Sequence, residues 1–228
     1  MFSLIKYKNL IEKLINSGLK PSINWSDKLS SETLFLRHDV DFSIEFAHLL
    51  ARAEQEINVK STYFFMLNSS FYNIISTDSQ SLVKDIADMG HKISIHFDPN
   101  AYKSLKNFIN EKLIFENIFK KKVDIVSIHR PGKFLDNNNI LLSGIPQTYQ
   151  DIYFKNMKYI SDSGGRDIFT HISEYLNGSS NMGLHLLVHP IWWVGLGDNP
   201  TDILNAWRSK KFDSITSQIR NNCKTYKD

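Results

Sequence analysis

The stretch LFLRHDVDFS, residues 34–43, decides the class of fold that this sequence predicts. Its apolar beginning is typical of a buried strand, yet the strand ends in several charged side chains. With the two-residue period of a strand, Arg37, Asp39 and Asp41 lie on one face. Two neighbouring carboxylates repel each other unless a cation lies between them or one stays protonated. A divalent metal or Arg37 would resolve that conflict. The alternative is structural, with Asp39 paired to Arg37 and Asp41 capping the following helix.

Strand-like and helix-like patterns alternate along the rest of the chain. Runs rich in β-branched and aromatic residues predict strands at residues 33–39, 61–67, 91–97, 123–129, 157–163 and 182–189. Apolar residues three or four apart predict helices at residues 7–18, 43–58, 79–90, 101–121, 166–176 and 201–222. Ser43 is the expected N-cap of the second helix. Such alternation implies parallel strands with crossover helices, so we predict an α/β protein.

Length and composition favour one ordinary globular domain. The chain has 228 residues, of which 42% are hydrophobic and 22% charged. Lys and Arg number 27 against 24 Asp and Glu, an excess too small to indicate nucleic acid or an anionic membrane as a partner. The single cysteine, Cys223, cannot form an intrachain disulfide. Since residues 1–10 lack the apolar core of a signal peptide, we expect a cytoplasmic protein without membrane insertion.

Polar side chains follow five of the predicted strands at the point where each strand ends. In parallel α/β folds, sites form beyond these carboxyl ends. The candidate residues are Asp39, Asp41, His96, His129, Arg130, Asp162 and His189. Five such strand ends in one chain are hard to explain by solubility alone, so we predict that they form a site.

Single members of this set also have structural interpretations. His96 ends its strand where a metal ligand belongs, and imidazole suits zinc, iron, cobalt or nickel, but a lone histidine can be structural. Pro131 biases Arg130 towards an extended conformation, which would point His129 and Arg130 to opposite sides. Arg130 could also be a solvated loop residue.

The roles of three residues in the last third of the chain are open in the same way. Asp162 precedes two glycines and could be a site acid or a simple turn residue. Trp192 and Trp193 could floor a sugar pocket, although their position favours ordinary core. The sequence contains no nucleophile elbow, dinucleotide fingerprint or P-loop.

In this order, the motifs from about Leu34 to Trp193 resemble the polysaccharide deacetylase family, the carbohydrate esterases that share a NodB homology domain. The H-D-V-D motif is most similar to a divergent branch associated with surface polysaccharide or lipopolysaccharide assembly. The resemblance implies a single-domain distorted (β/α) barrel with seven or eight mostly parallel strands. Its core would span residues 33–193, after an N-terminal helix and connector (1–32) and before a C-terminal helical segment (200–223).

The resemblance also implies a metal site. Asp39 matches the catalytic base and Asp41 a metal ligand, although Val40 separates two residues that are adjacent in the family. His96 matches the first metal-binding histidine, whereas Asn100 stands where the family has the second. We therefore expect His129 to supply the third ligand, and zinc to be the metal.

The remaining roles follow from the later motifs. Arg130 matches an arginine that orients the base, Asp162 the acid of the fourth motif, and His189 the general acid. We expect Arg37 and the two tryptophans, Trp192 and Trp193, to contact substrate.

The function implied is a metal-dependent hydrolase that removes an N-acetyl group from a sugar or glycan during surface polysaccharide assembly. Two alternatives remain at this stage. One is a catalytically silent barrel that binds a glycan, which Asn100 supports. The other is a related hydrolase of different non-peptide C–N bonds.

Overall fold

Parallel strands form a curled sheet in the computed structural model, which describes residues 2–137, 139–178 and 181–227. The strands are β1 (Lys20–Pro21), β2 (Thr33–Val40), β3 (Thr62–Phe65), β4 (Lys92–Phe97), β5 (Val126–Ile128), β6 (Lys158–Ser161) and β7 (Leu184–Val188). Their order is β5-β4-β3-β2-β7-β6, with the short β1 beside β2. All six strand pairings are parallel, which confirms the predicted α/β class.

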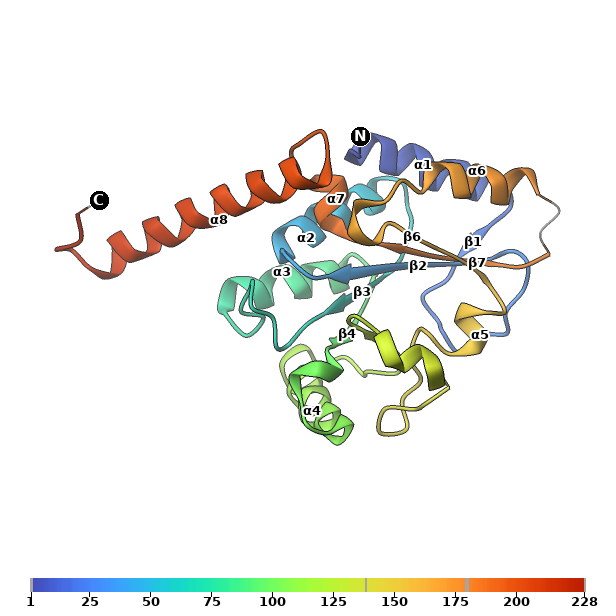
Figure 1. Ribbon diagram of the computed structural model, residues 1–228, viewed down its shortest axis with the longest axis horizontal. Helices are drawn as coiled ribbons and strands as arrows, with labels where there is room; N and C mark the ends of the chain where they lie inside the picture. Colours follow the sequence, from blue (N-terminus) through green and yellow to red (C-terminus); the bar gives the residue numbers. More distant parts are fainter. Residues whose placement is uncertain (1, 138, 179–180, 228) are drawn as a thin grey trace.

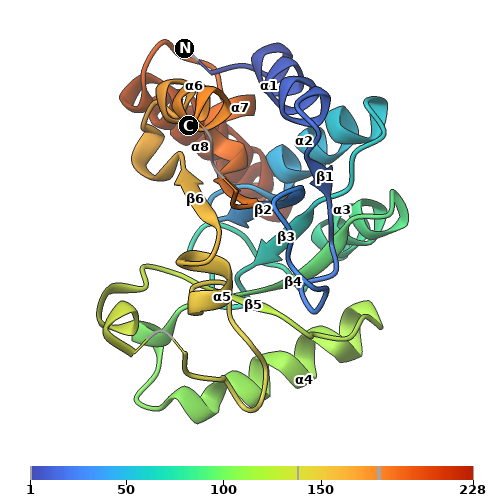
Figure 2. The same ribbon diagram turned by 90° about the vertical axis from the view of Figure 1, so that its right-hand side faces the viewer.

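Helices cover the outer side of this sheet (Figures 1 and 2). The helices are α1 (Leu4–Asn16), α2 (Ile44–Glu56), α3 (Thr77–Asp88), α4 (Phe108–Phe119), α5 (Asp151–Phe154), α6 (Phe169–Asn177), α7 (Pro190–Val194) and α8 (Pro200–Asn222). Two of them differ from the rest: α5 packs Tyr153 into the interior cluster, and α8 projects from the body. Figure 2 shows the strands curving round, with α1, α2, α3 and α4 following the outside of the curve. The predicted single-domain distorted (β/α) barrel is thereby confirmed, as a barrel left open between β5 and β6.

Local sequence signals account for most element boundaries. The hydroxyl of Ser43 accepts a hydrogen bond from the backbone N–H of Phe46, as predicted for an N-cap. The single helix predicted at residues 101–121 is wrong in its first part. Side chains of Asp98 and Ser104 cap two short 3₁₀ turns there, and α4 begins only at Phe108.

Alternation along β2 divides its side chains between two environments. Leu34 and Leu36 face outward into a core cluster shared with α1, α2, α6 and α7. Phe35 faces the interior of the barrel and stacks on Trp25, with ring centroids 4.2 Å apart. Trp25 also donates a hydrogen bond from Nε1 to Thr62 Oγ1. The interior is therefore packed near the amino ends of the strands.

Helix α8 extends well beyond the rest of the molecule (Figure 1). The predicted apolar face packs on the body only in its first half. Ile203 is buried and Trp207 is half-buried, whereas Ile215 and Ile219 are 45% and 39% exposed. Among the described residues, no helix combines the length and the apolar character needed to cross a membrane.

Candidate active site

A cleft with an empty volume of about 660 Å³ lies at the carboxyl ends of β2, β4, β5 and β7. It contains six of the predicted site residues: Asp39, Asp41, His96, His129, Arg130 and His189. Ser163 and Gly164, directly after Asp162, form part of its wall. The polar strand ends therefore gather in one place, in the lining of the cleft.

Three of these residues form a group that could hold a metal ion. Asp41, His96 and His129 each offer one ligand atom, and these atoms lie close together. Asp41 Oδ1 lies 3.2 Å from His96 Nε2 and 3.4 Å from His129 Nδ1, and the two nitrogens are 3.0 Å apart. Metal–ligand bonds of about 2.0–2.1 Å at tetrahedral or octahedral angles place ligand atoms about 2.8–3.4 Å apart. The three spacings therefore suit one divalent ion with further positions open for water and substrate.

The chemistry of the donor set agrees with that geometry. Asp41 Oδ1 is buried and makes no hydrogen bond, although two imidazole nitrogens face it. Burial alone would raise the pKa of Asp41, but His129, His96 and His189 hold it well below its usual range. An ionised, orphaned carboxylate oxygen is costly unless a cation satisfies it. The residues present thus fit a divalent metal.

Neighbouring residues orient the two histidines. Nδ1 of His96 lies 2.5 Å from the hydroxyl of Ser127 on β5, which leaves Nε2 to face Asp41. The backbone N–H of His129 donates to the carbonyl of Phe97 at the end of β4. Asn100, by contrast, is exposed in a 3₁₀ turn.

Asp39 is the carboxylate on the inner side of this group. Both of its oxygens accept hydrogen bonds from Arg37, at 2.9 Å from Nε and 2.7 Å from Nη2. Arg37 is itself fully buried and lies over the ring of Tyr149, 4.6 Å from its centroid. Burial would raise the pKa of Asp39, but Arg37 and then His96 lower it to about 2. Asp39 is therefore ionised at neutral pH and fixed in orientation.

This pairing changes the roles expected for the two arginines. The resemblance assigns the orientation of the base to Arg130, whereas the structure gives the contact with Asp39 to Arg37. Arg37 has no exposed surface with which to contact substrate. Arg130 is exposed at the cleft and has a φ of 48°, so the extended conformation expected before Pro131 is wrong. The chain turns sharply here, between the end of β5 and the 3₁₀ helix Gly132–Asn137.

His189, directly after β7, faces the group formed by Asp41, His96 and His129. Its Nε2 lies 3.9 Å from Asp41 Oδ2, and its Nδ1 lies 2.6 Å from Asp162 Oδ1. Burial would lower the pKa of His189, but the carboxylate of Asp162, followed by those of Asp41 and Asp39, raises it to about 9. His189 is thus a protonated imidazolium at neutral pH, with Nε2 directed to the cleft.

The tryptophans after His189 belong to the core instead of the cleft. Trp192 and Trp193 are only 5% and 1% exposed, and both pack in the cluster under α1 and α6. The prediction that they contact substrate is therefore corrected. Trp193 instead donates from Nε1 to Asp162 Oδ2 at 2.8 Å, which holds the carboxylate that supports His189.

Three residues that build the site carry no motif signal in the sequence. Tyr149 supports Arg37, Ser127 supports His96, and Leu187 lines the cleft. Ser127 lies inside a predicted strand, two residues before His129, so its face could have been inferred. Tyr149 reaches the site from an irregular segment, and no pattern in the sequence indicates this.

No protein-family model matches the sequence, and no curated protein does either. Solved structures with a similar course of chain include peptidoglycan deacetylase PdaC from Bacillus subtilis, at 10% identity and a TM-score of 0.47, covering 90% of this chain and 100% of that one. The chitin deacetylase of the fungal pathogen Colletotrichum lindemuthianum has 16% identity and a TM-score of 0.45, and the match covers 84% of this chain and 87% of that one. A CE4 family pseudoenzyme from Bacillus anthracis has 13% sequence identity and a TM-score of 0.44, and the match covers 86% of this chain and 65% of that one. At such identities and scores, these similarities assign neither a family nor an activity to this chain.

Proposed function

We propose that this protein is a metal-dependent hydrolase that removes an N-acetyl group from a sugar. The observation that carries the proposal is the group formed by Asp41, His96 and His129, whose donor atoms have the mutual spacing of ligands on one ion. A base and an acid flank that group. A divalent ion held there, zinc by our expectation, would polarise the amide carbonyl and lower the pKa of a water molecule.

The base in this proposal is Asp39. Its carboxylate is ionised, and Arg37 fixes it with two hydrogen bonds. It lies beside the ligand group, since its Oδ2 is 3.7 Å from His96 Nδ1. A carboxylate in this place can accept the proton of an attacking water at Oδ2.

The acid is His189. The imidazolium carries a proton on Nε2 at neutral pH because Asp162 holds Nδ1 and raises the pKa. The departing amine needs a proton before the C–N bond breaks, and Nε2 of His189, in the wall of the cleft, can deliver it. An ionised base and a protonated acid coexist near pH 7, which suits amide hydrolysis.

The sugar substrate rests on the resemblance of the motifs, and so does a role in surface polysaccharide or lipopolysaccharide assembly. We propose an activated sugar in the cytoplasm as the substrate. The family branch and the cellular location both stay predictions.

Metal content and amine release test the proposal together. Purified protein should bind about one divalent ion per chain, and Asp41→Ala or His96→Ala should lose it. His171→Ala is the matched control, because His171 is exposed on α6 and outside the cleft. Release of free amine from N-acetylated sugars should require the metal and disappear in Asp39→Asn. A folded protein that binds a glycan but no metal would refute the proposed hydrolase activity and support a catalytically silent, glycan-binding barrel.

A further inference from the structure

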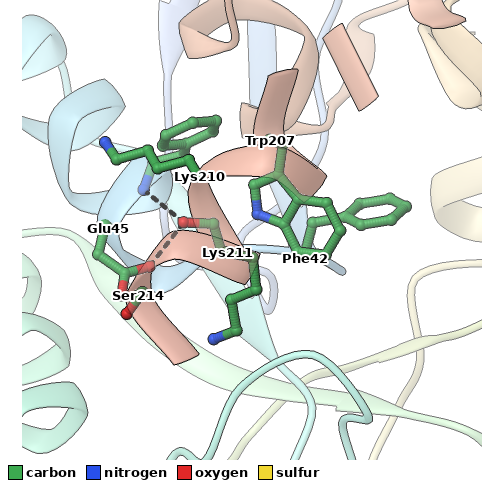
Figure 3. Close-up of a pocket in the computed structure, with 8 residues that line it drawn as sticks. Phe42, Glu45, Trp207, Lys210, Lys211 and Ser214 are labelled. Atoms are coloured by element: carbon green, nitrogen blue, oxygen red, sulfur yellow. Dashed lines mark hydrogen bonds between the residues drawn. The ribbon is translucent and has the colours of Figure 1, made fainter. Parts of the chain in front are cut away.

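A second pocket lies between the start of α2 and the outer part of α8 (Figure 3). Its empty volume is about 480 Å³. It is lined by Phe42, Ser43, Glu45, Phe46, Trp207, Lys210, Lys211 and Ser214, none of which lines the cleft described above. Figure 3 shows Trp207 beside Phe42 at one end, with Glu45, Lys210 and Ser214 towards the other. The pocket therefore has an aromatic end and a polar end.

The aromatic end is made of three rings in mutual contact. The centroid of Phe42 is 5.2 Å from that of Trp207 and 5.0 Å from that of Phe71. Phe71 and Trp207 are 5.3 Å apart, and Phe71 is 41% exposed. These rings are not sealed in the core, so they offer an apolar surface to a planar or apolar group.

The polar end carries an excess of positive charge. Among the described residues, neither Lys210 nor Lys211 has a carboxylate within ion-pair distance, and Lys210 lies over the ring of Phe46 at 5.8 Å. The one acid, Glu45, accepts a hydrogen bond from Ser43 at 2.6 Å. Two unpaired ammonium groups against one carboxylate leave a net charge of about +1 that favours an anion.

The pocket adjoins the candidate active site along the chain. Phe42 follows Asp41 directly, so their Cα atoms are about 3.8 Å apart. Phe71 follows β3 and α2 begins after β2, which puts the pocket at the same edge of the sheet as the cleft. A ligand held in this pocket would therefore lie next to the strand end that carries Asp41.

We propose that this pocket binds the phosphate-bearing carrier group of an activated sugar, with phosphate oxygens at Lys210 and Lys211 and the attached organic group against Trp207 and Phe42. The identification of the remainder as a sugar rests on the function proposed above. The shared chemistry is a diphosphate. It could come from a nucleotide-linked sugar, whose base would stack on the rings, or from a lipid-linked sugar, whose chain would lie along them.

Fluorescence of Trp207 provides a direct binding test. The other three tryptophans are buried in the core, so a ligand in this pocket should change the emission of Trp207 alone. Titration with inorganic diphosphate should give saturable binding that weakens as salt is raised. Calorimetry on Trp207→Phe should still show binding when the optical signal is lost.

Charge variants decide whether the lysines make the site. Lys210→Ala/Lys211→Ala should raise the Kd for diphosphate roughly ten-fold or more. The adjacent pair Lys121→Ala/Lys122→Ala is the matched control, because both are exposed after α4 and outside the pocket, and its Kd should not change. Glu45→Gln should lower the Kd, since it removes the one opposing charge.

Two comparisons complete the test. Tighter binding of uridine diphosphate than of inorganic diphosphate, lost in Trp207→Ala, would support the nucleotide source; tighter binding of a short prenyl diphosphate would support the lipid source. Absence of saturable binding, or equal Kd values for the two lysine-pair variants, would overturn the proposal. Asp41→Ala should abolish hydrolysis but keep the Kd for diphosphate, so failure of the pocket and failure of the hydrolase are separately visible.

Discussion

Replacing Glu54 with glutamine removes a buried charge that lies directly behind β2. Glu54 has no exposed surface and lies on α2. Hydrogen-bonding groups of four other buried residues surround its two carboxylate oxygens at 2.5–2.8 Å: Tyr7, His38, Ser61 and Tyr63. Because His38 precedes Asp39 on β2, this network anchors the strand that carries the proposed base.

The pKa of Glu54 sets the size of the effect. Burial would raise this pKa, but His38, then His91 and Tyr7, lower it from 4.5 to about 2. At about 1.4 kcal/mol per unit, the ionised form contributes about 3 kcal/mol to the free energy of unfolding. A depressed folded-state pKa gives stability that is present above pH 4.5 and is lost as pH falls towards 2. About 2 kcal/mol should be gone by pH 3.

Urea unfolding of wild type and Glu54→Gln between pH 7 and pH 3 measures this contribution. At pH 7 the variant should be less stable by about 3 kcal/mol or more, because Gln cannot accept all of the hydrogen bonds. The difference should shrink by about 2 kcal/mol at pH 3. Glu56→Gln is the control. Within the described part of the chain Glu56 has only an exposed ion pair, with Lys8, so the change should alter stability by under about 1 kcal/mol. A difference between wild type and Glu54→Gln that does not vary with pH would refute the reasoning.

Three further outcomes follow from the site and its supports. Arg37→Lys replaces the two hydrogen bonds to Asp39 with at most one. The rate of amine release should fall at least ten-fold, and the free energy of unfolding measured with urea should fall by about 2 kcal/mol. Full activity would contradict the role of Arg37. Asp162→Asn removes the main group that raises the pKa of His189 to about 9. The imidazolium loses its proton on the alkaline limb of the pH profile of kcat/KM, so the midpoint of that limb should move from about pH 9 towards pH 6.5. An unmoved limb would exclude His189 as the acid. Gly183→Ala would place a Cβ 2.7 Å from two backbone carbonyl oxygens that cannot easily move. The free energy of unfolding measured with urea should therefore fall by about 1–3 kcal/mol. An unchanged free energy of unfolding would contradict the tight packing beside β7.

Much of the proposed metal site is predictable from local sequence. Asp41, His96 and His129 each stand at or just after the end of a predicted strand, and parallel strands bring their carboxyl ends to one edge. His129 was expected as the third ligand, and it lies in the group, while Asn100 lies outside it. The strand ends therefore indicate the group, whereas the choice of His129 came from the resemblance of the motifs.

The sequence left the supports of that site open. Pairing of Asp39 with Arg37 was one of the alternatives that the strand period allowed, and the structure contains that pair. The role expected for Arg130 belongs to Arg37, because a buried guanidinium two residues before Asp39 on the same face reaches both carboxylate oxygens. Trp193 was expected at substrate and instead holds Asp162 from the core. Such contacts depend on which helix covers which strand, and side-chain period does not contain that information.

The sequence LFLRHDVDFS by itself determined a buried strand with acids on one face and a helix starting at Ser43, because backbone period and capping chemistry act over a few residues. Only the tertiary structure decided what each charge does. It paired Asp39 with Arg37, left one oxygen of Asp41 facing two histidines, and directed His38 to Glu54 on the other side of the sheet. The contacts of Asp41 and His38 depend on distances between segments far apart in the chain, and the pair of Arg37 with Asp39 depends on the burial that Tyr149 gives the guanidinium. Burial makes each of these contacts costly to change.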